Sequence, residues 1–167
     1  MRLGIKNSED TSMNIKLVKG DILQQDVEVI VNPWNQNIIP WWLIIPKGVS
    51  GAIKKQGGYA PFKELGKKGR IPLGHAIEIS AGKLPFKSII HVASINILWR
   101  TTKKSIRDSV QNAMKITTKN NYCSIALPLI GAGCGGLCSK KVLIYILEEL
   151  VLIEYDGEVR IVTFIAY

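Results

Sequence analysis

The sequence predicts an α/β fold in which helices cover both faces of a central sheet. Short apolar or β-branched segments alternate along the chain with segments whose apolar residues recur at helical spacing. This alternation is typical of a sheet packed between helices. The chain has 167 residues, of which 47% are hydrophobic, and this is enough for one domain with a substantial core.

Six segments have the character of strands, because each is short, apolar or β-branched, and bounded by turn residues. The first ends at Gly20-Asp21 and the second at Asn32-Pro33, after which a long loop is expected over residues 32–48. The strands are predicted at residues 15–19, 27–31, 75–80, 88–93, 125–130 and 159–165.

Four segments are predicted as helices. The first two, over residues 49–56 and 61–67, are short, and Gly57-Gly58 ends the first of them. A longer helix begins at residue 102 or 103, and a fourth begins at Ser139. Their inward faces carry Ile106, Val110, Met114, Val142, Leu143, Ile146, Leu147 and Leu150. Residues 1–13 are polar and expected to be loose, and residues 14–167 contain no linker, so they are predicted to form one domain.

A glycine-rich loop separates the strand at 125–130 from the helix at 139. It has glycine at 131, 133, 135 and 136. Glycine lets a ligand approach the main chain closely, and free N–H groups before a helix attract phosphate. The loop therefore predicts an anion site, although a turn that merely needs glycine is the alternative. It is neither a P-loop, since no Gly-Lys-Ser/Thr follows, nor a dinucleotide fingerprint, since the next strand has no acid at its tip.

The net charge of +9 and the isoelectric point of about 9.5 favour polyanionic ligands. Three cysteines fit a reducing compartment better than a disulfide scaffold. Cys134 and Cys138 are spaced as metal ligands can be, but a structural zinc site needs four ligands, so neither metal nor cofactor is expected. We expect a cytoplasmic protein, because no signal peptide is visible. The apolar run 38–46, which Pro40 interrupts, is far shorter than the roughly 20 residues that span a bilayer.

Six segments, in this order and spacing, resemble the macro domain, the ADP-ribose-binding module. They are VKGDI (18–22), VIVNPWN (29–35), KGVSGAI (47–53), IPLGHAIEIS (71–80), IIHVA (89–93) and ALPLIGAGCGG (126–136). The resemblance covers nearly the whole chain from Asn14 on. It implies a three-layer α/β/α fold with a mixed, mainly parallel six-stranded sheet.

The resemblance assigns a role to residues at two strand ends. The Asp21 carboxylate would accept from the adenine amino group, and Ile22 would lend a backbone N–H. Asn35 would bind ribose hydroxyls and, in a hydrolase, orient the distal ribose. Asn32 is expected to hold its own loop. From the residues alone, Asp21 and Asn35 could equally be turn residues. Pro33-Trp34 replaces the family's usual pair of small residues and is expected to reshape the ribose pocket.

The resemblance also implies two phosphate loops, formed by Gly48, Val49 and Ser50, and by Gly131, Ala132, Gly133, Cys134 and Gly135. Ser50 stands where many hydrolytic members have an aspartate, and a serine cannot take a proton as a carboxylate does. Lys54 roughly matches a lysine that another branch uses covalently. The alternative for Lys54 is a solvated helix lysine. One of Trp41 and Trp42 is a candidate for an aromatic wall at the distal ribose, with burial in the core as the alternative. Tyr167, just past the last strand, is a candidate to stack on adenine.

The implied function is binding of ADP-ribose or a derivative, free or attached to protein or nucleic acid. ADP-ribosyl hydrolase or O-acetyl-ADP-ribose deacetylase activity would accompany binding if water held by the ligand's own phosphate makes up for the missing carboxylate. Two alternatives stay open. One is a reader without catalysis, and the other is a basic protein that binds nucleic acid.

Overall fold

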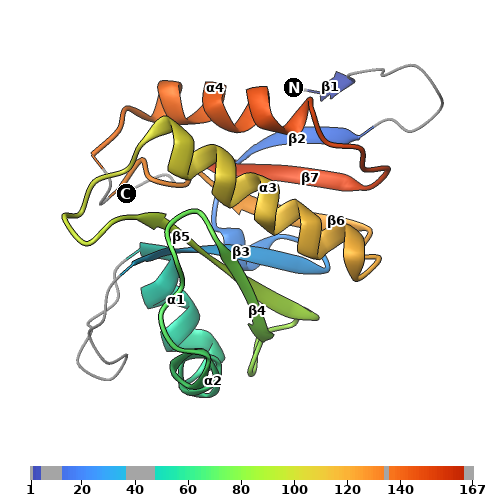
Figure 1. Cartoon of the computed structure of the whole chain (residues 1–167). Helices are drawn as coiled ribbons and strands as arrows, with labels where there is room; N and C mark the ends of the chain where they lie inside the picture. The colour runs from blue at the N-terminus through green and yellow to red at the C-terminus, as the bar shows by residue number, and fades with distance from the viewer. Residues whose placement is uncertain (1, 5–12, 37–47, 134–135, 164–167) are drawn as a thin grey trace.

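The computed structural model describes residues 2–4, 13–36, 48–133 and 136–163, which form a sheet with helices packed on both faces (Figure 1). The strands in this part of the chain are β1 (Arg2–Gly4), β2 (Asn14–Lys19), β3 (Val29–Asn35), β4 (Ala76–Ser80), β5 (Ser88–Ile95), β6 (Ser124–Pro128) and β7 (Glu158–Thr163). The helices are the 3₁₀ turn η1 (Ile22–Gln24), α1 (Gly48–Gly57), α2 (Ala60–Lys68), α3 (Lys103–Lys119) and α4 (Ser139–Leu150).

The sheet has the order β1-β2-β7-β6-β3-β5-β4. Strands β2, β7, β6, β3 and β5 run parallel, and β1 and β4 are antiparallel at the two edges. The mixed, mainly parallel sheet of the sequence prediction is thus confirmed, with all six predicted strands in it. Strand β1 was not predicted, and it lies in the segment 1–13 that was expected to be loose.

Helices α3 and α4 cover one face of the sheet, and α1 and α2 cover the other (Figure 1). Successive strand residues face opposite layers. Val29 and Val31 of β3 pack in the cluster that contains α3 and α4, whereas Ile30 packs in the cluster that contains α1 and α2. This alternation confirms the three-layer fold. Within the described ranges, no helix is both long and apolar enough to cross a membrane.

Strand β3 is longer than the sequence analysis predicted. It runs through Pro33 to Asn35, where a loop was expected from Asn32 on. Pairing with β6 involves only Val29 and Ile30, while pairing with β5 continues to Asn35. The outer half of β3 is therefore open on one side. Proline has no N–H to donate to a neighbouring strand, so it is tolerated where a strand has no neighbour on one side. The extension carries Asn35 out to the tip of the sheet.

An ion pair between the two helices of one layer gives the first prediction. Arg107 Nε of α3 lies 2.6 Å from Glu149 Oε2 of α4, and the Glu149 side chain is only 5% exposed. Removing the guanidinium leaves that carboxylate without its partner in a dry environment. We expect Arg107→Met to lower the free energy of unfolding by more than the loss of a fully exposed ion pair does, because the Glu149 end of the pair is buried.

Urea denaturation checks this expectation. Lys104→Met is the matched control, since the Lys104–Asp108 pair is exposed on the lysine side and joins residues of one helix. We expect that control to lose less than about 0.5 kcal/mol. Equal losses in the two variants would contradict the prediction.

Candidate functional site

The carboxyl ends of five parallel strands define the candidate site. Because β2, β7, β6, β3 and β5 are parallel, their carboxyl ends lie at one edge of the sheet. Asp21 follows β2, Asn35 ends β3, and the glycine loop from Gly131 follows β6. Ligands of open α/β sheets bind outside this edge. η1, which begins directly after Asp21, also contacts both β6 and α1.

Asp21 caps the short turn η1. Its Oδ1 accepts from Leu23 N at 2.9 Å, and its carbonyl accepts from Gln25 Nε2. The turn-capping alternative of the sequence analysis is therefore present. From the described residues, Oδ2 accepts no hydrogen bond, so one oxygen of the carboxylate can still receive a donor. Ile22 begins the turn with its side chain buried.

A buried polar network fixes the outer part of β3. The Ser50 hydroxyl donates to Asn32 Oδ1 at 2.8 Å, and Asn32 Nδ2 lies 3.0 Å from His91 Nδ1. Since the amide nitrogen can only donate, we assign the histidine proton to Nε2. The network joins α1, β3 and β5. Asn32 thus has the structural role expected of it, but its partners are side chains of other elements rather than its own loop.

His91 is fully buried in β5, as the sequence analysis expected for a core histidine. Its ring meets the rings of Trp34 and Phe62 edge-on, at centroid distances of 5.8 and 6.1 Å. Burial lowers the pKa of His91 from 6.5 to about 3. Within the described part of the chain, His91 Nε2 has no hydrogen-bond partner. The imidazole is therefore neutral at ordinary pH and acts as an acceptor for Asn32.

The buried histidine predicts a pH-dependent stability. Below pH 6.5 the unfolded chain binds a proton on His91, while the folded protein stays neutral there until about pH 3. The unfolded state binds more protons in this window, so stability falls as the pH falls. Between pH 6.5 and pH 5 we expect a loss of about 1.5 kcal/mol.

Urea titrations at pH 7, 6.5, 6, 5.5 and 5 measure this loss. Glu28 and Glu158 do not titrate in this range, because hydrogen bonds to basic side chains help to lower their pKa values below the ordinary glutamate value. His91→Gln removes the titrating group, and its unfolding free energy should be nearly constant over the same range. A wild-type profile as flat as that of the variant would contradict the account.

The first predicted phosphate loop, residues 48–50, includes Ser50 of this network. Gly48 begins α1 with φ 58° and is exposed, while Val49 is half-buried. Ser50 is buried and turns its hydroxyl toward Asn32, so only its main chain remains to bind a ligand. Lys54 lies one turn further on, with Nζ 5.1 Å from the ring centroid of Tyr59. The structure therefore places Lys54 near the start of α2.

The second predicted phosphate loop begins with Gly131, whose backbone lies in the left-handed region that favours glycine. Gly131 is buried with φ 90°, and a Cβ there would lie 2.5 Å from Thr101 Cγ2. Ala132 N donates to Leu129 O at 3.1 Å, so that amide closes a turn. Gly133 is exposed, and a Cβ at this position would point into open space. Cys134 and Gly135 lie outside the described residues, as do Trp41, Trp42 and Tyr167.

A family model described as Macro domain matches residues 31–146, well over half of the chain. The chain belongs to the macro domain family. Among proteins of similar sequence, the O-acetyl-ADP-ribose deacetylase of Escherichia coli (strain K12) is 32% identical over 130 residues, which are 73% of this chain and 70% of that protein.

Two solved structures have the same fold as this macro domain. An Oceanobacillus iheyensis macrodomain mutant with ADPR superposes with a TM-score of 0.80 at 24% identity, covering 98% of this chain and 89% of that one. The macrodomain of Mycobacterium tuberculosis DarG has a TM-score of 0.74 at 22% identity, covering 89% and 96%. At these identities the similarity concerns the fold.

Sequence reasoning missed the contacts of two residues that support the candidate site. Thr101 packs under Gly131, and its only sequence signal was a position next to a helix start. His91 was expected in the core, but not as the partner of Asn32. Trp34, expected to reshape the ribose pocket, packs its ring 5.8 Å from that of Phe62.

No cluster of three or more His, Cys, Asp or Glu side chains that could hold a metal occurs among the described residues.

Proposed function

We propose that this macro domain binds ADP-ribose, either free or attached to a macromolecule. One observation carries the proposal. Asp21, Asn35 and the glycine loop from Gly131 follow three parallel strands of one sheet, so they lie at the same edge. The three segments offer a carboxylate, a side-chain amide and main-chain N–H groups, and ADP-ribose has a different part for each of them to bind.

Each part of ADP-ribose has a matching group at this edge. The adenine amino group donates, and the open oxygen of Asp21 accepts. The diphosphate needs N–H donors, and the main chain of residues 48–50 at the start of α1 and of the glycine loop from Gly131 would supply them. Ribose hydroxyls both donate and accept, as the Asn35 amide does. The net charge of +9 attracts the anionic ligand.

Calorimetry with ADP-ribose, AMP and NAD tests this proposal. We expect ADP-ribose to bind more tightly than AMP, because AMP lacks the second phosphate and the distal ribose that would contact the second loop and Asn35. Asp21→Ser should weaken ADP-ribose about 10-fold, since it removes a charge-assisted hydrogen bond. Serine still caps η1, so the variant should fold. No heat with ADP-ribose at millimolar concentration would end the proposal.

A second candidate function is hydrolysis of an ADP-ribose derivative. It is favoured by the relationship to the E. coli O-acetyl-ADP-ribose deacetylase. Position 50 contributes no carboxylate here, and its hydroxyl is engaged by Asn32. Activation of water would then depend on the ligand phosphate, with Asn35 orienting the distal ribose.

Mass spectrometry of O-acetyl-ADP-ribose and of ADP-ribosylated protein, after incubation with the protein, separates hydrolysis from binding alone. Asn35→Ala should abolish turnover if this candidate is right. Lys54→Ala should leave turnover unchanged, because Lys54 Nζ lies over the Tyr59 ring. If the wild-type sample still contains only intact, uncleaved substrate, binding without hydrolysis remains as the function.

A further inference from the structure

The end of β3, which carries Asn35, is set by an irregularity in its partner strand. Trp34 pairs with Ala93 of β5, but Asn35 pairs with Ile95, so Ser94 is an extra residue in β5. Bulges of this kind often lie next to binding sites, where they re-aim a side chain or end the regular pairing. Here the bulge comes directly before the last pair of the strand, which is the pair that contains Asn35.

The bulge is tied to the start of α3. Ser105 Oγ lies 2.9 Å from Ser94 O and 3.0 Å from Thr102 O, so its one proton is shared between the bulge and the helix cap. The same oxygen accepts from Thr102 N at 3.0 Å. Because Ser94 and Ser105 are both buried, water cannot easily take the place of this contact. The bulge therefore has a fixed position relative to α3.

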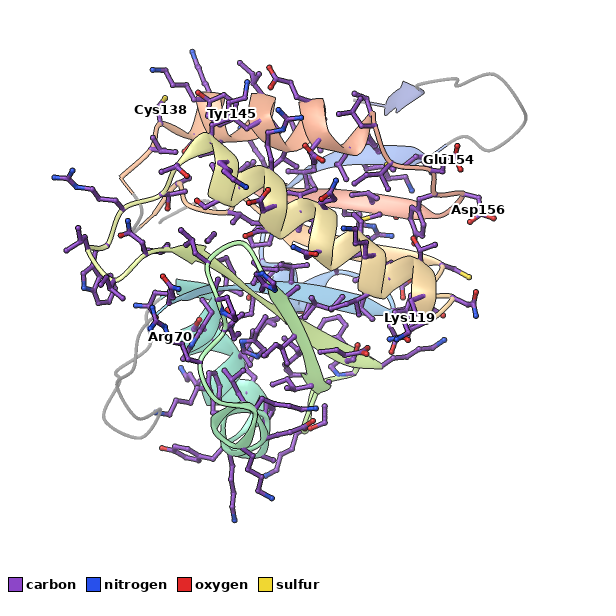
Figure 2. The ribbon with its side chains drawn as sticks, viewed as in Figure 1. Arg70, Lys119, Cys138, Tyr145, Glu154 and Asp156 are labelled. Carbon is purple, nitrogen blue, oxygen red and sulfur yellow. The ribbon has the colours of Figure 1, made fainter. Side chains whose placement is uncertain are left out.

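Gln36 joins the end of β3 to the bulge and to the segment before β4. Its N–H donates to Ile95 O at 2.7 Å. We orient its side-chain amide so that Oε1 accepts from Leu73 N at 3.2 Å and from Arg70 Nη2 at 3.0 Å, because the opposite orientation would bring the amide nitrogen against these two donors. Figure 2 shows Arg70 on the side of the molecule at which β3 ends. The residue next to Asn35 is thus held from two directions.

The segment that supports Gln36 is itself held by β5 and α3. Gly74 N donates to Ala93 O at 2.7 Å, and Asn112 Nδ2 of α3 donates to Gly74 O at 2.9 Å. Gly74 has φ 81°, and a Cβ at this position would lie only 2.7 Å from Asp108 Cβ. The segment therefore approaches α3 so closely that only glycine fits there. Gln36 is bonded to a support that has little freedom to move.

We propose that Gln36 is a positioning residue, which Arg70 and Leu73 N hold so that the neighbouring Asn35 stays fixed for the distal ribose. The inference rests on the proposed function and adds a selectivity to it. The site would prefer nucleotides with a second ribose to ADP, which ends at the second phosphate. A group that is already fixed before binding loses less conformational entropy when the ligand arrives. Gln36 acts through Asn35 and is not itself a ligand contact.

Calorimetry with ADP-ribose and ADP on two Gln36 variants tests the inference. Methionine is similar in shape but accepts hydrogen bonds only weakly, whereas glutamate keeps an oxygen for both donors. We expect Gln36→Met to weaken ADP-ribose about 10-fold and to leave ADP within about 2-fold of wild type. Gln36→Glu should keep the wild-type ratio of the two affinities, because its carboxylate still accepts from Arg70 and Leu73 N.

Two arginine variants separate the hydrogen bond to Gln36 from the loss of positive charge. Arg70→Met removes one of the two donors, so we expect the preference for ADP-ribose over ADP to fall about 3-fold. Arg100 is also exposed and lies on the connection that leaves the end of β5. Arg100→Met removes the same charge near this edge and should leave the preference unchanged.

Amide hydrogen exchange of the ligand-free protein tests the positioning without any nucleotide. The N–H at position 36, which donates to Ile95 O, should exchange about 10-fold faster in Gln36→Met than in wild type, while that of Ile30 inside β3 should not change. Unchanged exchange at position 36, or equal losses of ADP-ribose and ADP affinity in Gln36→Met, would overturn the inference. Wild-type protein that does not bind ADP-ribose would instead end the proposed function, and the inference with it.

Discussion

Gly131→Ala is expected to lower the free energy of unfolding by about 3 kcal/mol, from left-handed backbone strain and overpacking together. Gly131 has φ 90°, which an alanine adopts only with strain. The new methyl group would lie 2.5 Å from Thr101 Cγ2 and 3.0 Å from Thr101 Oγ1. Thr101 is buried at the start of α3, so it has little room to move. Chemical denaturation measures the loss directly.

Gly133→Ala is the matched control for this substitution. Its Cβ would have no atom within 4 Å, and its φ lies outside the left-handed region. We expect its unfolding free energy to stay within about 0.5 kcal/mol of wild type. Thr101→Ser in the Gly131→Ala background should recover part of the loss, because it removes the methyl group nearest to the new Cβ. Equal losses at Gly131 and Gly133 would refute the packing argument.

Asn32→Ala is expected to destabilise the protein by a similar amount, about 3 kcal/mol, because it leaves two buried partners without their hydrogen bonds and opens a small cavity. Those partners are Ser50 Oγ and His91 Nδ1. Both side chains are buried, and water has no free access to replace the amide. Thermal and urea unfolding measure the effect.

Ser50→Ala tests the same network from its other end. It removes the donor to Asn32 Oδ1 and a longer contact of the same hydroxyl with Pro33 O at 3.4 Å, so we expect a loss of about 1–2 kcal/mol. The double variant should lose less than the sum of the single losses, because the two residues share one hydrogen bond. Additive losses, or an Asn32→Ala protein as stable as wild type, would show that the network does not hold β3 to α1.

The fold was largely predictable because each element has a local signal. Apolar residues at helical spacing placed α3 with Ile106, Val110 and Met114 inward, and these three side chains are fully buried. Buried runs bounded by turn residues placed the parallel strands. One exception is β1, which lies in the segment expected to be loose, and another is the outer half of β3, where Pro33 indicated a loop. Local sequence does not reveal that β6 pairs only with the first two residues of β3. Proline is acceptable at position 33 because β6 does not pair with this part of the strand.

The candidate site was predictable in outline but not in detail. The glycines and the strand-end polar residues indicated which segments lie at the carboxyl edge of the sheet. The partners of Ser50 and Asn32 depended on packing between α1, β3 and β5, which are distant in sequence. Hence Ser50 was expected to face the ligand, whereas the structure shows its hydroxyl buried against Asn32. The roles of Gly48, Val49 and Asn35 in binding or catalysis stay predictions, as does the expectation that Lys54 has none.

The central claim is that separate strand ends converge on one ADP-ribose molecule, and a ¹H–¹⁵N NMR titration of the labelled protein with ADP-ribose tests it most directly. The account predicts saturable shifts of the backbone amides of Asp21, Ile22, Asn35 and residues 131–136, all with one apparent dissociation constant. Amides at the opposite edge, such as those of Asp26 and Glu154, should not move. Shifts confined to only one of these strand ends, or shifts at the opposite edge instead, would contradict the account.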